Sequence, residues 1–320
     1  MKYETIIIRY GEIGLKGRVT RKNFEQSLIN NIKNALRTKQ IPHTIKKGWG
    51  RIYVYTDQIN KSIPILQRVF GITSISPAVQ TQSTMDEMAK FAVNSSKEAL
   101  TKGKSFAMRI TRTGKHNFTS QDVAVKIGSD VVKATNAFVN LTKPDFELFI
   151  EIRDDDAFIF EEKIRGTGGL PLGTQGKALS VVDSPKSILA AWYLMRRGCK
   201  IDFAITAKIK EDMLQSFIEN WNSYSDITHI TGQRKNLYKS LNKTALEKNC
   251  DAIVTGHTLY ENQSDCLSEI KLLKQYAEIP ILNPLIAMDG KTILLIESSA
   301  DILTFNCVFP VIFKPFSFMA

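Results

Sequence analysis

Cysteine and histidine are both scarce in this chain of 320 residues. The four cysteines form no CxxC pair, which argues against a disulfide framework or a zinc ribbon and favours a reducing, cytoplasmic setting. The four histidines are too dispersed in the sequence to predict a metal site. No apolar run approaches the roughly 20 residues that span a bilayer, and the N-terminus is typical of a short strand, not of a signal peptide. We therefore expect no membrane association.

The composition is that of a globular protein, with 43% hydrophobic and 23% charged residues. The length exceeds one typical core, so we expect two or three domains. The net charge of +11 is uneven, because residues 1–165 carry 27 Lys and Arg against 17 Asp and Glu, and the remainder carries 16 against 15. A basic half joined to a neutral half indicates that one part binds a polyanion, although a merely solvated surface would give the same asymmetry.

The apolar pattern of the first half predicts two small α/β units. In residues 1–60, strands at 5–10 and 51–56 flank a helix whose apolar residues recur every four positions, an order that fits a ferredoxin-like unit. In residues 61–165, we expect helices at 85–100 and from residue 120, and strands at 105–111, 146–153 and 157–162.

From residue 177 onward, apolar strands alternate with helices, which predicts a parallel sheet covered on both faces. The expected strands lie at 178–182, 201–206, 227–230 and 252–254, with helices at about 187–197, 211–221 and 237–248 between them. Ligands of such sheets bind beyond the carboxyl ends of the strands.

The loop after the first of these strands, Asp183–Ser187 (DSPKS), contains no glycine. A nucleotide phosphate would bind there, because helix-terminal N–H groups and the helix dipole favour anions, but close backbone approach usually needs glycine. Pro185 removes a backbone N–H, and Lys186 could partly compensate as a point charge. The alternative is a helix-capping turn, with Asp183 or Ser184 as the cap and Pro185 in the first turn.

Four segments of the chain carry a family resemblance. They are residues 9–32 (RYGEIGLKGRVTRKNFEQSLINNI), 146–177 (FELFIEIRDDDAFIFEEKIRGTGGLPLGTQGK), 252–270 (AIVTGHTLYENQSDCLSEI) and 279–286 (IPILNPLI). In this order they resemble parts of the tRNA 4-thiouridine synthetases, sulfurtransferases also linked to thiamine biosynthesis. The first segment resembles the opening of their ferredoxin-like domain, and the second the end of their RNA-binding THUMP domain. The last two resemble the second half of their PP-loop pyrophosphatase domain.

The resemblance implies an α/β and α+β multidomain fold. It comprises a ferredoxin-like domain over residues 1–60, a THUMP domain over 61–165 and a Rossmann-like, parallel-sheet PP-loop domain over 166–320. The first two would hold tRNA. The third would use ATP and Mg²⁺ to adenylate a uridine, and persulfide sulfur would then replace the activated oxygen to give 4-thiouridine. The sulfur donor, a cysteine desulfurase or inorganic sulfide, and a homodimeric state stay open.

Two other functions remain. A catalytically decayed relative would bind tRNA without ATP-dependent chemistry, which the loop without glycine favours. The second alternative is a PP-loop enzyme that acts on thiamine precursors. The basic first half of the chain argues against a protein whose substrates are only small molecules.

The resemblance also implies nucleotide-site residues. The family's phosphate loop is SGGxDS, and a gapless alignment puts DSPKS in its place with one residue missing. A gapped alignment instead matches Asp183-Ser184-Pro185 to the DSP that ends the family motif, and both alignments lose the glycine pair. Arg234 stands where the family has a nucleotide-contacting arginine, and Gly256 where it has a glycine close to the nucleotide; a surface arginine and a simple strand end are the alternatives. Asp265 replaces a glutamine, and its carboxylate near a triphosphate is unfavourable unless Mg²⁺ intervenes. We expect Asp183 to have a catalytic role. The expected nucleotide-binding residues are Val181, Val182, Ser184, Lys186, Ser187, Arg234, Gly256 and Asp265.

Sulfur relay needs a thiolate that carries a persulfide. Cys307 lies about where the family keeps such a cysteine, and an inert thiol buried among aromatic neighbours is the alternative. Without a CxxC pair we predict no iron–sulfur cluster, and we expect a short form that lacks a rhodanese-like domain.

For RNA, the expected contacts come from basic residues and one aromatic ring in the first half. Any one of these basic residues, taken alone, is more simply explained as a solvated residue of the protein surface. As a set, they favour binding of tRNA by its shape, and we expect the affinity to fall as the salt concentration rises. Phe118 would stack on an exposed base. The expected residues are Arg18, Arg21, Lys22, Arg109, Arg112, Lys115 and Phe118.

Overall fold

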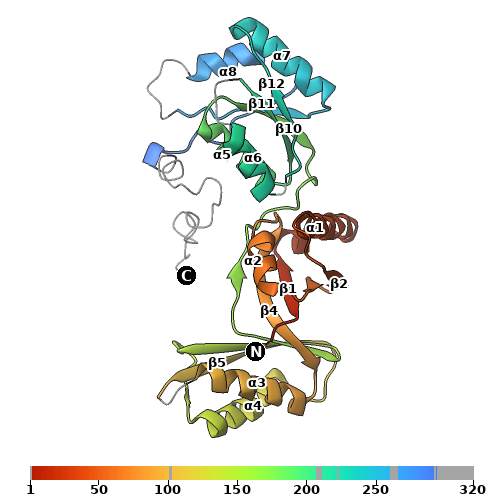
Figure 1. The fold of residues 1–320 in the computed structure, drawn as a ribbon, viewed down its shortest axis with the longest axis vertical. Helices are drawn as coiled ribbons and strands as arrows, with labels where there is room; N and C mark the ends of the chain where they lie inside the picture. Colours follow the sequence, from red (N-terminus) through yellow and green to blue (C-terminus); the bar gives the residue numbers. More distant parts are fainter. Residues whose placement is uncertain are drawn as a thin grey trace. The chain divides into compact units, whose positions relative to one another are not determined.

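The computed structural model of the chain describes residues 2–100, 103–206, 211–221, 223–259, 266–291 and 293. Its strands form two sheets, and its residues group into two compact units (Figure 1). Unit 1 contains the residues up to Gly11, Ile32–Gln67 and Ile72–Gly166, whereas unit 2 contains Glu12–Asn31, Arg68–Gly71 and the chain from Thr167. Within the described ranges, no helix is both long enough and apolar enough to cross a membrane.

The described strands of unit 1 form one continuous sheet of nine strands in the order β2-β3-β1-β4-β8-β7-β5-β6, with β9 paired to β4. The long strand β4 makes the sheet continuous, because it pairs with β1 along residues 72–78 and with β8 along residues 79–82. The two small units predicted from the sequence therefore share a sheet. The strands are β1 (Thr5–Tyr10), β2 (Thr44–Gly48), β3 (Arg51–Tyr55), β4 (Ile72–Gln82), β5 (Ser105–Thr113), β6 (Phe138–Val139), β7 (Phe146–Arg153), β8 (Asp156–Phe160) and β9 (Ile164–Arg165).

Two helices of unit 1, α3 (Met85–Ala99) and α4 (Ser120–Thr135), bury their apolar faces in one core with β7 and β8. Threonine begins both helices. Thr84 accepts a hydrogen bond from the backbone N–H of Glu87, and Thr119 forms a capping box with Asp122. Both helices lie where the sequence pattern predicts them.

The remaining helices of the first half are the short 3-10 helix η1 (Glu12–Leu15), α1 (Arg18–Thr38) and α2 (Ile59–Gln67). The sequence pattern predicts α1, whose apolar stripe is buried, but it predicts neither α2 nor β2. α2 contains Pro64, a residue that usually ends a helix. β2 has one apolar residue, Ile45, so the alternation that marks a strand is missing.

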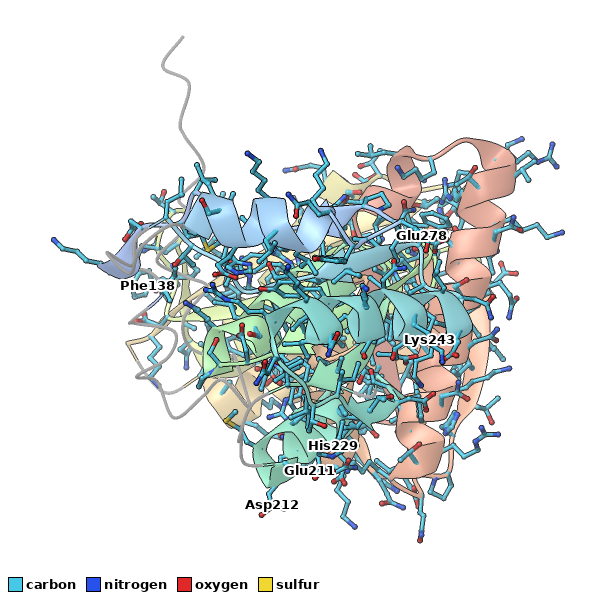
Figure 2. The ribbon with its side chains drawn as sticks, turned by 90° about the horizontal axis from the view of Figure 1, so that it is seen from above. Phe138, Glu211, Asp212, His229, Lys243 and Glu278 are labelled. Atoms are coloured by element: carbon cyan, nitrogen blue, oxygen red, sulfur yellow. The ribbon has the colours of Figure 1, made fainter. Side chains whose placement is uncertain are left out.

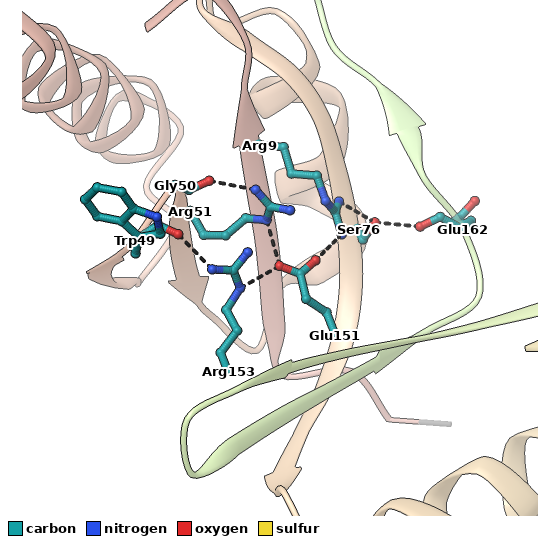
Figure 3. Close-up of polar contacts among 8 residues, drawn as sticks. All are labelled: Arg9, Trp49, Gly50, Arg51, Ser76, Glu151, Arg153 and Glu162. Atoms are coloured by element: carbon teal, nitrogen blue, oxygen red, sulfur yellow. Dashed lines mark hydrogen bonds and ion pairs between the residues drawn. The ribbon is translucent and has the colours of Figure 1, made fainter. Parts of the chain in front are cut away.

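A buried carboxylate ties the two parts of the unit 1 sheet together (Figure 3). Glu151 on β7 accepts hydrogen bonds from Arg9 on β1 at 3.2 Å, from Arg51 on β3 at 2.8 Å and from Arg153 at 2.7 Å. Arg153 also donates to the carbonyl oxygen of Trp49 at 2.7 Å. Strands that belong to the ferredoxin-like and THUMP-like segments are thus joined through one side chain.

Unit 2 contains the predicted parallel sheet, in the order β12-β11-β10-β13-β14. Apolar side chains of β10 alternate between two cores: Ala178 and Val182 face the core with α5 and α6, and Leu179 and Val181 face the core with α7 and α8. Figure 1 shows these two pairs of helices on the two faces of the sheet. Burial on both faces explains the continuous apolar runs. The strands are β10 (Lys177–Val182), β11 (Lys200–Ile205), β12 (Ile227–His229), β13 (Ala252–Val254) and β14 (Ile281–Leu282), and the helices are α5 (Pro185–Arg196), α6 (Glu211–Asn220), α7 (Arg234–Glu247) and α8 (Cys266–Lys274).

Two segments from the first half of the sequence pack within unit 2. Phe70 is 2% exposed, and its ring stacks on Trp221 at a centroid distance of 5.2 Å. Arg197, after α5, forms a bidentate pair with Glu12, with both distances at 2.9 Å. A core residue of the parallel-sheet unit is therefore supplied by the loop before β4.

Candidate active site and nucleic-acid interface

The carboxyl edge of the parallel sheet gathers most of the predicted nucleotide-site residues. Strand order reverses at β10, whose neighbours are β11 and β13, and such a reversal is where open parallel sheets bind ligands. Asp183–Ser187 follow β10, and Gly256 follows β13. A Cβ atom added to Gly256 would lie 2.9 Å from both the Cα and the N of Ser187, so only glycine permits this approach of the two loops.

The β10–α5 loop is closed on itself by side-chain hydrogen bonds. Asp183 Oδ1 accepts from the hydroxyl of Ser187 at 2.6 Å and from that of Ser184 at 3.0 Å. No residue from Lys177 to Arg197 has a positive φ, so the loop follows a path that needs no glycine. This is a different loop conformation from the left-handed turns in which glycine is required.

The start of α5 matches the capping alternative only in part. Ser184 is the N-cap residue and Pro185 is the first helical residue, but the Ser184 side chain does not bond a helix N–H. α7 likewise begins after Gln233 without a side-chain cap. Neither helix has an acidic residue in its first turn, and Lys186 and Arg234 place cations there. A cation at a helix N-terminus is unfavourable, because that end of the helix dipole is positive. A bound anion would offset this repulsion and would also accept hydrogen bonds from the uncapped N–H groups.

Arg234 lies inside α7, which begins three residues earlier than the apolar pattern predicts. Its guanidinium is ion-paired with Glu269 of α8, whose second oxygen accepts from the Tyr238 hydroxyl at 2.6 Å. Burial, together with the bond to Glu269, raises the pKa of Tyr238 to about 12, and the charge of Asp183 adds to the shift. The sequence reasoning missed Tyr238 and Glu269, although Tyr238 stands one helical turn after Arg234.

A polar chain lies beyond β13 and β14. Asn283 donates to the hydroxyl of Thr255, which is hydrogen-bonded to His257 Nδ1 at 2.6 Å. Thr258 is 3% exposed, and its hydroxyl has no partner among the described residues. At the end of β12, His229 Nε2 lies 3.3 Å from Glu211 Oε2, and Figure 2 labels both residues. Within the described ranges, no group of three or more His, Cys, Asp or Glu side chains is arranged to hold a metal ion.

Two predicted residues, Asp265 and Cys307, lie outside the described residues. Burial raises the pKa of the thiols of Cys199 and Cys250, which disfavours the thiolate in both. Cys199 also donates to the carbonyl oxygen of Gln175 at 3.4 Å. Neither thiol has the environment of a persulfide carrier.

The predicted RNA-contacting residues fall into two groups, one in each unit. Arg18, Arg21 and Lys22 lie in the first turns of α1 in unit 2, where Arg21 pairs with Glu25 at 2.9 Å. Arg109, Arg112, Lys115 and Phe118 lie on β5 and the loop to α4 in unit 1.

The unit 1 group is partly engaged in contacts within the protein. Arg109 pairs with Glu147 at 2.7 Å, and Arg112 contacts His116 Nδ1 at 3.2 Å. Phe118 lies 5.1 Å from the His116 ring and packs against the core of α3 and α4. Its predicted role in stacking on a base stays a prediction.

A second basic surface, missed in the sequence, lines a pocket of about 220 Å³ in unit 1. Lys46 and Lys47 contribute positive charge, and Trp49 is 76% exposed beside them. The pocket is also lined by Arg153, which is paired with Glu151, and by the acidic Asp154 and Asp156. Cations next to an exposed aromatic ring suit phosphates and unstacked bases. The available signal was the Lys-Lys-Gly-Trp-Gly turn before β3.

Family models match three parts of the chain: the ThiI ferredoxin-like domain over residues 5–76, the THUMP domain over 82–161 and the thiamine biosynthesis protein (ThiI) over 212–309. The probable tRNA sulfurtransferase of Methanobrevibacter smithii is 34% identical over 96% of this chain and 88% of its own length. The probable tRNA sulfurtransferase of Methanocaldococcus jannaschii is also 34% identical, over 91% and 86%.

Two solved structures share the fold. A protein from Pyrococcus horikoshii superposes with a TM-score of 0.79 at 29% identity, over 92% of this chain and 98% of its own. A 4-thiouridine synthetase in complex with RNA and ATP superposes with a TM-score of 0.77 at 23% identity, over 98% and 87%. The predicted α/β and α+β fold, with ferredoxin-like, THUMP and parallel-sheet PP-loop domains, is confirmed. The chain belongs to the tRNA sulfurtransferase family.

Proposed function

We propose that this protein uses ATP to replace the O4 oxygen of a tRNA uridine with sulfur, giving 4-thiouridine. The observation that carries the proposal is the β10–α5 loop pressed against Gly256 at the point where strand order reverses. Two uncapped helix N-termini that carry cations begin at the same edge of the sheet. This donor set suits a triphosphate, because its charge would be met by helix N–H groups, Lys186 and Arg234.

The protein residues have separate tasks in this proposal. Ser184, Ser187 and the end of β10, including Val181 and Val182, border the nucleotide. Asp183 offers the single carboxylate that Mg²⁺ commonly uses beside substrate phosphates. Bound ATP supplies the adenylyl group that makes the uridine oxygen a leaving group. The proposed sulfur carrier is the thiolate of Cys307, which a cysteine desulfurase would load as a persulfide by transferring sulfane sulfur. Inorganic sulfide, the alternative donor, would instead attack the activated uridine carbon directly and displace AMP, without a persulfide on Cys307. Asp265 is proposed to border the same nucleotide.

The substrate is proposed to be tRNA because the chain's first half is basic and contains the THUMP segment. Related proteins are named as tRNA sulfurtransferases, and one structural relative was solved with RNA and ATP. We further propose the three-domain division at residues 60 and 165, and a homodimer.

A second candidate function is tRNA binding without ATP-dependent chemistry. The observation that favours it is the self-bonded loop, in which Asp183 already accepts from the hydroxyls of Ser184 and Ser187. A nucleotide would have to compete with these bonds.

Calorimetric titration of the full chain with Mg-ATP separates the two candidates. We expect binding that Lys186→Ala weakens and that Lys243→Ala, an exposed change on α7, leaves unchanged. In a thiolation assay with tRNA, ATP and a persulfide donor, Cys307→Ser should abolish 4-thiouridine formation. Absence of Mg-ATP binding and of 4-thiouridine in the unmodified protein, together with retained tRNA binding, would favour the second candidate.

A further inference from the structure

Three side chains at the carboxyl edge of the parallel sheet form a hydrogen-bonded chain. Arg234 donates through Nη2 to Glu269 Oε1, and Tyr238 donates its hydroxyl to Glu269 Oε2 at 2.6 Å. Arg234 and Tyr238 stand one turn apart on α7, whereas Glu269 stands on α8. One carboxylate thus connects the N-terminal turn of α7 to the neighbouring helix.

The contact differs from an ordinary surface ion pair. The side chain of Arg234 is 73% exposed, but that of Glu269 is only 27% exposed and has a second donor in Tyr238. Exposed pairs usually hold weakly because two long side chains must both be ordered. Here Tyr238 orders the carboxylate, so only the arginine loses conformational freedom. The Tyr238 hydroxyl is protonated at neutral pH, as any tyrosine is, and its raised pKa extends this to higher pH.

The guanidinium retains donors for another ligand. Arginine presents five N–H donors in a rigid planar fork. Within the described residues, the bond to Glu269 uses Nη2, and no bond from Nε or Nη1 is formed. Arg234 is also the first residue of α7, directly after the N-cap residue Gln233, whose side chain makes no capping hydrogen bond. α7 follows β12 as α5 follows β10, so both helices begin at the carboxyl edge of the same parallel sheet.

We propose that Glu269, held by Tyr238, is a positioning residue that orients the free edge of Arg234 toward the phosphates of the nucleotide. This inference rests on the proposed nucleotide site. The opposite role, in which Glu269 competes with phosphate for Arg234, would require the carboxylate to occupy the donor edge that phosphate needs. The contact uses only Nη2 and leaves Nε and Nη1 for a phosphate, which favours positioning.

The test measures Mg-ATP affinity of the full chain by calorimetry. Glu269→Gln removes the charge but keeps the shape, and Tyr238→Phe removes the hydroxyl without touching Arg234. We expect each to weaken Mg-ATP binding, by up to about fivefold for Glu269→Gln, which corresponds to the ~1 kcal/mol upper range of an exposed pair. The matched control is Glu247→Gln, which breaks the exposed Lys243–Glu247 pair on the same helix and should change nothing.

A double-variant cycle distinguishes positioning from a general structural effect. If Glu269 acts through Arg234, then Glu269→Gln should cause no further loss in an Arg234→Gln background. Independent, additive losses would overturn the proposal, and so would unchanged or tighter Mg-ATP binding by Glu269→Gln. Failure of the proposed nucleotide site would appear instead as absence of Mg-ATP binding in the unmodified protein, and the positioning role would then fall with it.

Discussion

The cluster around Glu151 allows a quantitative prediction about unit 1. Its side chain is 5% exposed and accepts from three arginines, Arg9, Arg51 and Arg153, so its removal leaves three guanidinium groups together without their shared counter-charge. Breaking a buried ion pair by removing one partner typically costs about 3–5 kcal/mol. We therefore expect Glu151→Gln to lower the free energy of unfolding of unit 1 by about that amount.

The pH dependence follows from the pKa of Glu151. Burial alone would raise this pKa, but the positive charges of Arg51, Arg153 and Arg9 outweigh it and hold the pKa below its ordinary value. A carboxyl whose folded pKa is depressed contributes stability that is complete above the unfolded pKa, near 4.5, and is lost as pH falls through the folded pKa. The protonated side chain then resembles glutamine, so the difference between variant and unmodified protein should shrink below about pH 4.5.

Hydrogen exchange of the β1 and β7 amides measures the opening of this region directly. The matched control is Glu147→Gln, because Glu147 pairs with Arg109 at the surface with both side chains more than one-third exposed. That change should cost no more than about 1 kcal/mol. A destabilisation below about 1 kcal/mol for Glu151→Gln, or an equal destabilisation at neutral pH and well below the unfolded pKa, would refute the reasoning.

Three further changes test other parts of the structure. Phe70→Ala should lower the free energy of unfolding by about 3–5 kcal/mol in thermal denaturation, because it empties a buried aromatic site in the core of unit 2. Gly256→Ala should weaken Mg-ATP binding in calorimetry, since its Cβ would press on the backbone of Ser187. Replacing both Lys46 and Lys47 by Gln should weaken tRNA binding in a salt titration. The slope of the logarithm of the binding constant against the logarithm of salt concentration should become shallower by about one for each phosphate that a lysine no longer neutralises.

Each of these changes has a matched control. Phe138 is 55% exposed, so Phe138→Ala should leave stability nearly unchanged. Gly14 has open space where its Cβ would stand, so Gly14→Ala should leave Mg-ATP affinity as it is. Exposed Lys133, in the last turn of α4, is the control for the tRNA surface. Equal effects of a test variant and its control would contradict the corresponding argument.

The sequence predicted the elements whose apolar residues follow a regular period. β10 alternates between two apolar cores, and α1 carries an apolar stripe, so both were recognisable from spacing alone. β2 was missed because it presents charged residues instead of an apolar face, and its place at the sheet edge depends on pairing with β3. Pairing between strands is a long-range event that local periodicity does not encode.

The sequence also predicted where along the chain nucleotide-site residues would stand, but not what they touch. The loop without glycine suggested a lost phosphate site, whereas the structure gives that loop a backbone path without positive φ. Gly256 stands out in the fold because its backbone lies so close to Ser187 that no Cβ atom fits between them, although the two residues are 69 positions apart in the sequence. Glu269 and Tyr238 carried no sequence signal of their own, since charged and aromatic residues are common on helix surfaces.

The sequence by itself determined the family, the parallel sheet and the basic first half, because these depend on composition, period and ordered motifs along the chain. Tertiary structure alone decided that β4 joins two segments into one sheet, that Phe70 completes the core of unit 2, and that one carboxylate holds three arginines. The physical reason is that such contacts join residues far apart in the sequence. Their energies depend on distance and burial, which exist only once the chain is folded.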